Sequence, residues 1–134
     1  MRPIIAIFLV TIFQISCTGQ NPTKPLPRGM SIEPNYMNVD NATAKRIISQ
    51  SKDLIIIDVR TPDEIALGKI GNALEMDIKS PDFKSNLDKL DRNKQYLVYC
   101  HAGGRSTNAM EIMKTMGFKQ VYNLESGYRS WSDK

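Results

Sequence analysis

Hydrophobic positions along the chain fall into short continuous runs separated by segments with helical spacing. Continuous apolar, β-branched or aromatic runs predict buried strands over residues 54–57, 96–99 and 121–124, and a shorter strand is expected around residues 73–76. Between these runs, apolar positions recur three and four residues apart and predict helices. Strands that alternate with helices predict an α/β domain with a mainly parallel sheet and helices on both faces.

Polar residues indicate where these helices begin. Asp40 or Asn41 can cap the first helix, and Thr61 can cap the second with Glu64 completing a capping box. Ser80-Pro81 is typical of the start of a third helix. The carboxyl ends of parallel strands meet at one edge of a sheet, so we expect functional loops to gather there.

One loop at that edge, with the sequence CHAGGRS, joins the strand at residues 96–99 to a predicted helix with Ser106 among the residues able to cap its start. The first turn of a helix offers unsatisfied N–H groups and the positive end of a dipole. No residue from 101 to 106 is proline, and Gly103-Gly104 allows the backbone to curl inward. The pattern therefore predicts a reactive Cys100 thiolate held by main-chain donors, in preference to an inert buried cysteine.

This loop resembles the active-site loop of the rhodanese family of single-domain sulfurtransferases. The stretch IIIDVRTPDEIALGKIGNALEMDI resembles an earlier signature of that family, and VYNLESGYRSW resembles its closing strand and helix. The resemblance runs from about residue 36 to 131 and implies a five-stranded sheet. It also implies transfer of a sulfane sulfur from thiosulfate or a similar donor to a thiol or cyanide through a Cys100 persulfide, without a cofactor.

Site residues are assigned on this basis. Cys100 is the expected nucleophile, and substrate contacts are expected from the loop residues His101, Ala102, Gly103, Gly104, Arg105 and Ser106. Arg105 is assigned to the anionic part of the donor, with a solvent-facing arginine as the alternative. His101 is expected at the rim of the site more than as a base for Cys100. The resemblance implies that Asp58 and Arg60 support the loop, as a bracing or ion-paired couple. One histidine and two cysteines supply too few ligands to predict a metal site.

The first 35 residues have a different character from the rest. Residues 1–17 combine a charged start with an apolar run too short to span a bilayer, which predicts an export signal. Its end resembles a bacterial lipobox and predicts lipidation of Cys17, with ordinary cleavage nearby, for instance after Gly19, as the alternative. Residues 18–35 are rich in proline and predict a tether, which leaves residues 36–134 as the folded domain. The expected location is the periplasm or outer membrane of a bacterium.

Charge and loop length limit the other functions. Residues 36–134 carry 15 basic and 13 acidic residues, so no nucleic-acid partner is expected. The expected partners are a small thiosulfate-like donor and a thiol acceptor such as a thioredoxin-like protein. A thiol-based phosphatase or arsenate reductase is a rival, but its loop has five residues between cysteine and arginine whereas this chain has four. A second rival is a sulfur-relay or redox-sensing module that does not turn over.

Overall fold

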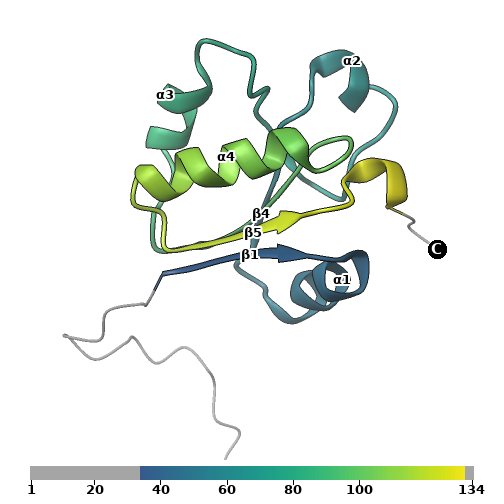
Figure 1. Ribbon diagram of the computed structural model, residues 1–134, viewed down its shortest axis with the longest axis horizontal. Coiled ribbons are helices and arrows are strands. Elements are labelled where there is room, and N and C mark those ends of the chain that lie inside the picture. The colour runs from purple at the N-terminus through teal and green to yellow at the C-terminus, as the bar shows by residue number, and fades with distance from the viewer. Residues whose placement is uncertain (1–33, 132–134) are drawn as a thin grey trace, which may run out of the picture. The chain divides into compact units, whose positions relative to one another are not determined.

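The computed structural model describes residues 34–131, which form one five-stranded sheet. Its strands are β1 (Asn35–Val39), β2 (Ile55–Asp58), β3 (Leu74–Glu75), β4 (Gln95–Tyr99) and β5 (Gln120–Leu124). They lie in the order β1-β5-β4-β2-β3, and every neighbouring pair is parallel (Figure 1). The predicted fold class is confirmed, and the sheet is wholly rather than mainly parallel. The predicted export signal, Cys17 and most of the predicted tether lie outside the described residues.

Strand β1 corrects the predicted start of the domain. Asn35 was assigned to the tether, but it pairs with Gln120 of β5 and its N–H donates to the carbonyl of Lys119 (2.7 Å). The segment NYMNV contains no continuous apolar run, and its middle residues are exposed. Its strand conformation follows from pairing with β5 rather than from a local pattern.

In the described part of the chain, four α-helices and one 3-10 turn connect or follow the strands. They are α1 (Asn41–Gln50), α2 (Pro62–Ile65), α3 (Phe83–Asp88), α4 (Gly104–Thr115) and η1 (Tyr128–Ser130). Asp40 caps α1 by accepting the N–H of Thr43 (2.8 Å), and Thr61 and Glu64 form the predicted capping box of α2. Helix α3 begins after Ser80-Pro81, because those residues form a turn in which the carbonyl of Ser80 accepts the N–H of Phe83. No helix within residues 34–131 has the length and apolar character needed to cross a bilayer.

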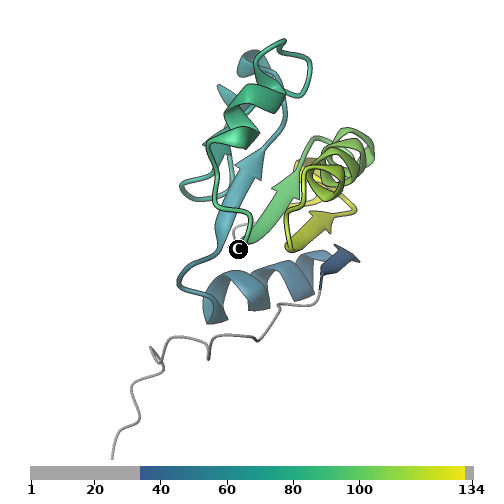
Figure 2. The same ribbon diagram turned by 90° about the vertical axis from the view of Figure 1, so that its left-hand side faces the viewer.

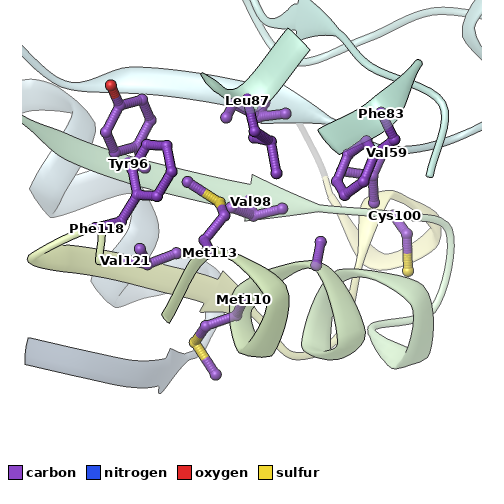
Figure 3. Close-up of a cluster of buried hydrophobic side chains, with 12 residues drawn as sticks. Val59, Phe83, Leu87, Tyr96, Val98, Cys100, Met110, Met113, Phe118 and Val121 are labelled. Carbon is purple, nitrogen blue, oxygen red and sulfur yellow. The ribbon is translucent and has the colours of Figure 1, made fainter. Parts of the chain in front are cut away.

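Alternate residues of β4 pack on opposite faces of the sheet. Tyr96 and Val98 join a buried cluster with side chains of α3 and α4, and Cys100 lies at the end of that cluster (Figure 3). Leu97 and Tyr99 join a second cluster, which includes Ala44 of α1. The views of Figures 1 and 2 accordingly show α4 and α1 on opposite sides of the sheet.

This topology sets the position of the site. Strand β4 lies between β5 and β2, and Asp58 at the end of β2 is level with Tyr99. The residues that follow β2 and β4 therefore meet at the carboxyl edge of the sheet, where ligands bind in open α/β folds.

Candidate active site

The loop that follows β4 turns at Gly103, the residue that caps α4. Gly103 has a φ of 92°, and a Cβ atom there would collide with the main-chain carbonyl of Glu125, so both conformation and space require glycine. Gly104 is less constrained, since a Cβ atom there would meet nothing within 4 Å. The expected capping role of Ser106 is wrong, because its hydroxyl donates to the carbonyl of Gly103 (2.9 Å) from within the helix.

The Cys100 side chain is enclosed by this loop. Only 1% of the residue is exposed, and its sulfur accepts the N–H of Gly103 (3.1 Å) and lies 3.5 Å from the Ser106 hydroxyl. Burial acts to raise the pKa of the thiol, but the Ser106 hydroxyl and the N–H groups of Ser106, Ala102 and Gly103 outweigh it, so the pKa lies below its usual value. From the sequence, an inert buried cysteine and a reactive thiolate are alternatives. In the structure the Cys100 thiol is buried and its pKa is lowered.

The Ser106 hydroxyl has one proton and two neighbours that can accept it. It donates to the Gly103 carbonyl at 2.9 Å, while Cys100 Sγ is more distant at 3.5 Å. A hydroxyl rotates freely to the better acceptor, and a thiolate is a better acceptor than a thiol. The hydrogen bond from Ser106 to Cys100 therefore strengthens as the sulfur gains negative charge.

The segment after β5 forms two main-chain hydrogen bonds with the Cys100 loop. The N–H of Tyr128 donates to the carbonyl of Cys100 (2.8 Å), and the N–H of Arg129 donates to the carbonyl of His101 (3.0 Å). Gly127, with a φ of 65° and a ψ of −173°, lies directly against the peptide between His101 and Ala102. These hydrogen bonds fix the loop in the conformation in which the N–H groups of Ala102 and Gly103 act on the sulfur. No role in the site is predicted for this segment from its residues.

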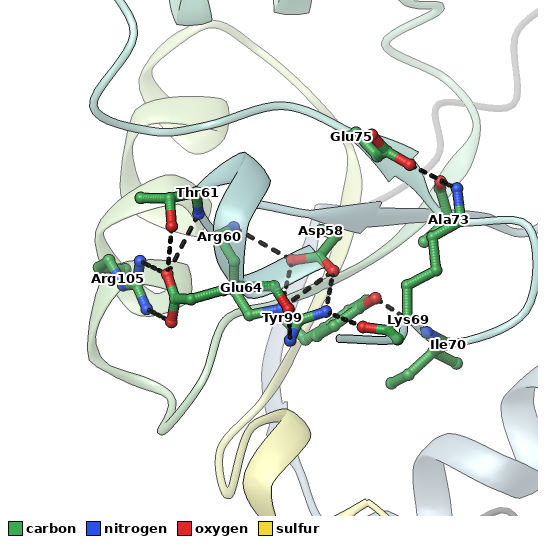
Figure 4. Close-up of polar contacts among 11 residues, drawn as sticks. Asp58, Arg60, Thr61, Glu64, Lys69, Ile70, Ala73, Glu75, Tyr99 and Arg105 are labelled. Atoms are coloured by element: carbon green, nitrogen blue, oxygen red, sulfur yellow. Dashed lines mark hydrogen bonds and ion pairs between the residues drawn. The ribbon is translucent and has the colours of Figure 1, made fainter. Parts of the chain in front are cut away.

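Arg105, the residue predicted to bind the anionic part of the donor, is part-exposed and pairs with a carboxylate of the chain. It forms a two-pronged ion pair with Glu64 of α2, at 2.7 and 2.6 Å (Figure 4). The hydrogen bonds from Arg105 lower the pKa of Glu64 to about 2, so this carboxylate is charged at neutral pH. Glu64 was expected only as a capping residue. Its Oε2 atom does accept the Thr61 N–H and hydroxyl, and the same atom accepts from Arg105.

Asp58 and Arg60 form a buried ion pair beside the loop. Arg60 is 2% exposed and donates to both oxygens of Asp58, at distances from 2.6 to 3.0 Å. Its remaining N–H groups donate to the carbonyls of Glu64 (3.2 Å) and Gly68 (2.7 Å), and its guanidinium lies 4.1 Å from the ring centre of Tyr128. The pair thus fixes the segment that carries Glu64 (Figure 4). It also contacts the Cys100 loop indirectly, because the ring of Tyr128 lies against the Arg60 guanidinium and the Tyr128 N–H donates to the Cys100 carbonyl.

A pocket of about 530 Å³ opens beside the loop. The residues around it include Arg60, Glu64, Leu67, His101, Tyr128 and Trp131. His101 is exposed and lies at this rim, while Ala102 and Gly104 are exposed on the outer surface of the loop. Within residues 34–131, no group of three histidine, cysteine or acidic side chains is placed to hold a metal ion.

The central feature of the candidate site is a buried cysteine at the carboxyl end of a central parallel strand, with main-chain donors around its sulfur. Residues 40–134 match the family described as the rhodanese-like domain, and the chain belongs to that family. The sequence resemblance to rhodaneses is thereby confirmed.

Relatives and solved structures agree with this assignment. The chain is 34% identical over 93 residues to YtwF of Bacillus subtilis, an alignment that covers 69% of this chain and 87% of that protein. It is 30% identical over 96 residues to the thiosulfate sulfurtransferase GlpE of Coxiella burnetii, covering 72% and 87% of the two chains. The crystal structure of a rhodanese-like domain protein from Staphylococcus aureus superposes with a TM-score of 0.65 at 30% identity, over 73% of this chain and 93% of that one. Relatives of similar length are thus single-domain sulfurtransferases.

Proposed function

We propose that the protein transfers a sulfane sulfur through a persulfide on Cys100. The observation that carries this proposal is the environment of one atom, Cys100 Sγ, which is buried and yet receives N–H donors from its own loop. These donors stabilise a negative sulfur without a metal or a strong base. They suit a terminal persulfide sulfur for the same reason, since that sulfur is also an anion.

The reaction has two displacement steps. The Cys100 thiolate attacks the outer sulfur of a thiosulfonate-type donor, and a new sulfur–sulfur bond forms with the electron pair of the thiolate. The bond between the two donor sulfurs breaks, and its electron pair leaves with sulfite or a sulfinate. An acceptor thiolate or cyanide then attacks the terminal sulfur, and the Cys100 thiolate leaves. No net oxidation or proton transfer is required.

A phosphatase or arsenate reductase is disfavoured by the same loop. Phosphoryl chemistry requires cationic groups on the equatorial oxygens of the transferred group. Here the arginine of the loop is paired with Glu64, and only four residues separate it from Cys100. The narrower ring and the neutralised arginine favour a single sulfur anion over a tetrahedral oxyanion.

Mass spectrometry combined with turnover tests the proposal. After treatment with thiosulfate or benzenethiosulfonate, the Cys100 peptide should gain the mass of one sulfur atom, and Cys100→Ser should gain none. Cyanide or a reduced thioredoxin-like protein should remove that sulfur, and thiocyanate should accumulate through repeated cycles with cyanide. Loading without repeated cycles would indicate a sulfur relay. Hydrolysis of an aryl phosphate without any sulfur loading would overturn the assignment.

We also propose that the domain is exported and held at a bacterial membrane by a lipid on Cys17. The support is the charged start, the short apolar run and the lipobox-like residues that precede Cys17. The mass of the native N-terminal peptide tests this proposal. A lipid-modified Cys17 is expected at the new N-terminus, and an unmodified N-terminus after Gly19 would contradict lipidation.

A further inference from the structure

The main-chain carbonyl of Gly103 is offered more hydrogen-bond donors than it can use. The N–H of Thr107 donates to it at 3.0 Å, the Thr107 hydroxyl at 2.9 Å and the Ser106 hydroxyl at 2.9 Å. A carbonyl oxygen has two lone pairs, and the two donors of Thr107 are enough to satisfy both. The Ser106 hydroxyl is therefore the surplus donor, and its other neighbour is Cys100 Sγ at 3.5 Å.

A side chain of β5 fixes the direction of the Thr107 hydroxyl. The Asn123 amide donates to Thr107 Oγ1 (3.0 Å), so the proton of that hydroxyl points away from Asn123 and toward the Gly103 carbonyl. The same amide donates to Oδ1 of Asn38 (2.9 Å), the residue opposite Asn123 on β1. A line of hydrogen bonds thus runs from the edge of the sheet to the turn that encloses the cysteine.

The surroundings of Asn123 support a role beyond stability. Its side chain is 1% exposed, and within residues 34–131 its Oδ1 atom has no hydrogen-bond partner. A buried amide oxygen without a partner destabilises a fold. The part of the amide that the structure does use is its donor group, which is directed at Asn38 and Thr107.

We infer that Thr107 and Asn123 are positioning residues that free the Ser106 hydroxyl to stabilise the Cys100 thiolate. Neither residue has a hydrogen bond to the sulfur: Thr107 acts through Ser106, and Asn123 acts through Thr107. When the sulfur is negative, the Ser106 hydroxyl turns to it and the Gly103 carbonyl stays paired, so the rotation leaves no buried group unsatisfied.

The consequence for catalysis rests on the proposed sulfur transfer. In the first displacement the Cys100 thiolate is the nucleophile, and in the second it is the leaving group. Stabilising its charge raises the fraction of ionised sulfur before the first step and favours its departure in the second.

Two substitutions at position 107 separate the hydroxyl from the rest of the side chain. Thr107→Val removes the hydroxyl and retains the shape, so the Gly103 carbonyl is left with one N–H and requires the Ser106 hydroxyl. Thr107→Ser retains a hydroxyl and should restore the behaviour of the unaltered protein. The matched control is Thr115→Val at the other end of α4, where the hydroxyl donates to the carbonyl of Ile112 (2.7 Å).

The rate of Cys100 alkylation by iodoacetamide, measured across a pH series, gives the reactivity of the thiol. On the acid side of the profile, Thr107→Val should react about two- to fivefold more slowly, because the thiolate loses most of one hydrogen bond. The pKa of Cys100 should rise in the same variant. Thr107→Ser and Thr115→Val should keep the original profile. An unchanged profile in Thr107→Val, or equal slowing in Thr115→Val, would overturn the inference.

A double-mutant cycle with Ser106→Ala tests whether Thr107 acts through Ser106. Without the Ser106 hydroxyl, Thr107→Val should have no further effect on the alkylation rate. Equal slowing by Thr107→Val in both backgrounds would show that Thr107 acts on the sulfur by another route and would contradict the inference. The charged and titratable side chains around the site are unchanged throughout this cycle: Asp58, Arg60, Glu64, His101, Arg105 and Arg129.

Sulfur transfer is measured separately on the same proteins. With thiosulfate and cyanide, kcat/KM for the donor should fall in Thr107→Val by about the factor found for alkylation and should recover in Thr107→Ser. If no donor forms a Cys100 persulfide, the proposed function fails while the alkylation cycle still decides the role of Thr107. A normal persulfide with an unchanged alkylation profile removes only the role of Thr107.

Discussion

Replacing Gly127 with alanine tests whether the segment after β5 controls the reactivity of Cys100. Gly127 has a φ of 65° and a ψ of −173°, a backbone region that is almost restricted to glycine. A methyl group there would collide with the carbonyl of His101 and the nitrogen of Ala102. These are main-chain atoms that cannot rotate away, so the active loop itself would have to move.

The expected loss of stability in Gly127→Ala has two contributions. Placing alanine in this backbone region costs about 1–3 kcal/mol. Displacing the loop adds to this, so we expect Gly127→Ala to lower the free energy of unfolding by about 3–5 kcal/mol. Gly71→Ala is the matched control, since Gly71 also has a positive φ of 48° but its Cβ would meet nothing within 4 Å. The control should lose only about 1–2 kcal/mol.

Thermal unfolding measures the loss of stability. The rate of Cys100 alkylation by iodoacetamide measures the reactivity of the thiol. For a domain of this size each kcal/mol lowers Tm by about 4–8 °C, so the two variants are readily separated. At a temperature where both are folded, Gly127→Ala should be alkylated more slowly at neutral pH, because fewer N–H groups face its sulfur. Equal Tm values, or unchanged alkylation of Gly127→Ala, would refute the proposed coupling between this segment and the loop.

Further predictions concern the charged groups around the site. Asp58→Asn leaves the buried Arg60 without its carboxylate and should lower the free energy of unfolding in urea by about 3–5 kcal/mol, and combining it with Arg60→Met should recover part of that loss. Ser106→Ala should slow Cys100 alkylation about three- to tenfold at neutral pH, since the thiolate loses a long hydrogen bond, and an unchanged rate would exclude that role. Because the folded pKa of Cys100 is lowered, the folded chain binds fewer protons than the unfolded one between the two pKa values. The ionised thiol should therefore stabilise the fold above the unfolded pKa, and this stabilisation should be lost as pH falls through the folded pKa. Alkylation rates measured against pH for the folded and the urea-unfolded protein would give the two pKa values. Glu64, with a pKa of about 2 against 4.5 unperturbed, should contribute stability that is complete above pH 4.5 and disappears as pH falls through 2, which a carboxyl NMR titration can follow.

The sequence predicted the sheet well where a strand is buried on both faces. The run at β4 is continuously apolar because both sides of that strand face a core, and β2 follows the same rule. β1 is an edge strand with exposed positions, so its composition carries no such signal. Its place in the sheet is set by pairing with β5, whose residues lie 85 positions further along the chain (Asn35 with Gln120).

For the site, local patterns pointed to Cys100 and missed the groups that surround its loop. Cys100 stands at a strand-to-helix junction, and that junction is visible in a few consecutive residues. Arg105 and Glu64 lie 41 residues apart, so no local pattern shows that they pair. The capping box already accounts for a glutamate at position 64, so nothing in the sequence pointed to a second role. Gly127 likewise appeared as an ordinary turn glycine, because the peptide that it contacts belongs to another loop.

The hydrogen bonds from Tyr128 and Arg129 to the Cys100 loop have a consequence for folding. These residues follow β5 and reach the loop only when β5 has paired in the sheet. An unfolded chain therefore carries an ordinary, weakly ionised thiol. The pKa of this thiol is lowered only in the folded domain, so its reactivity reports that folding is complete.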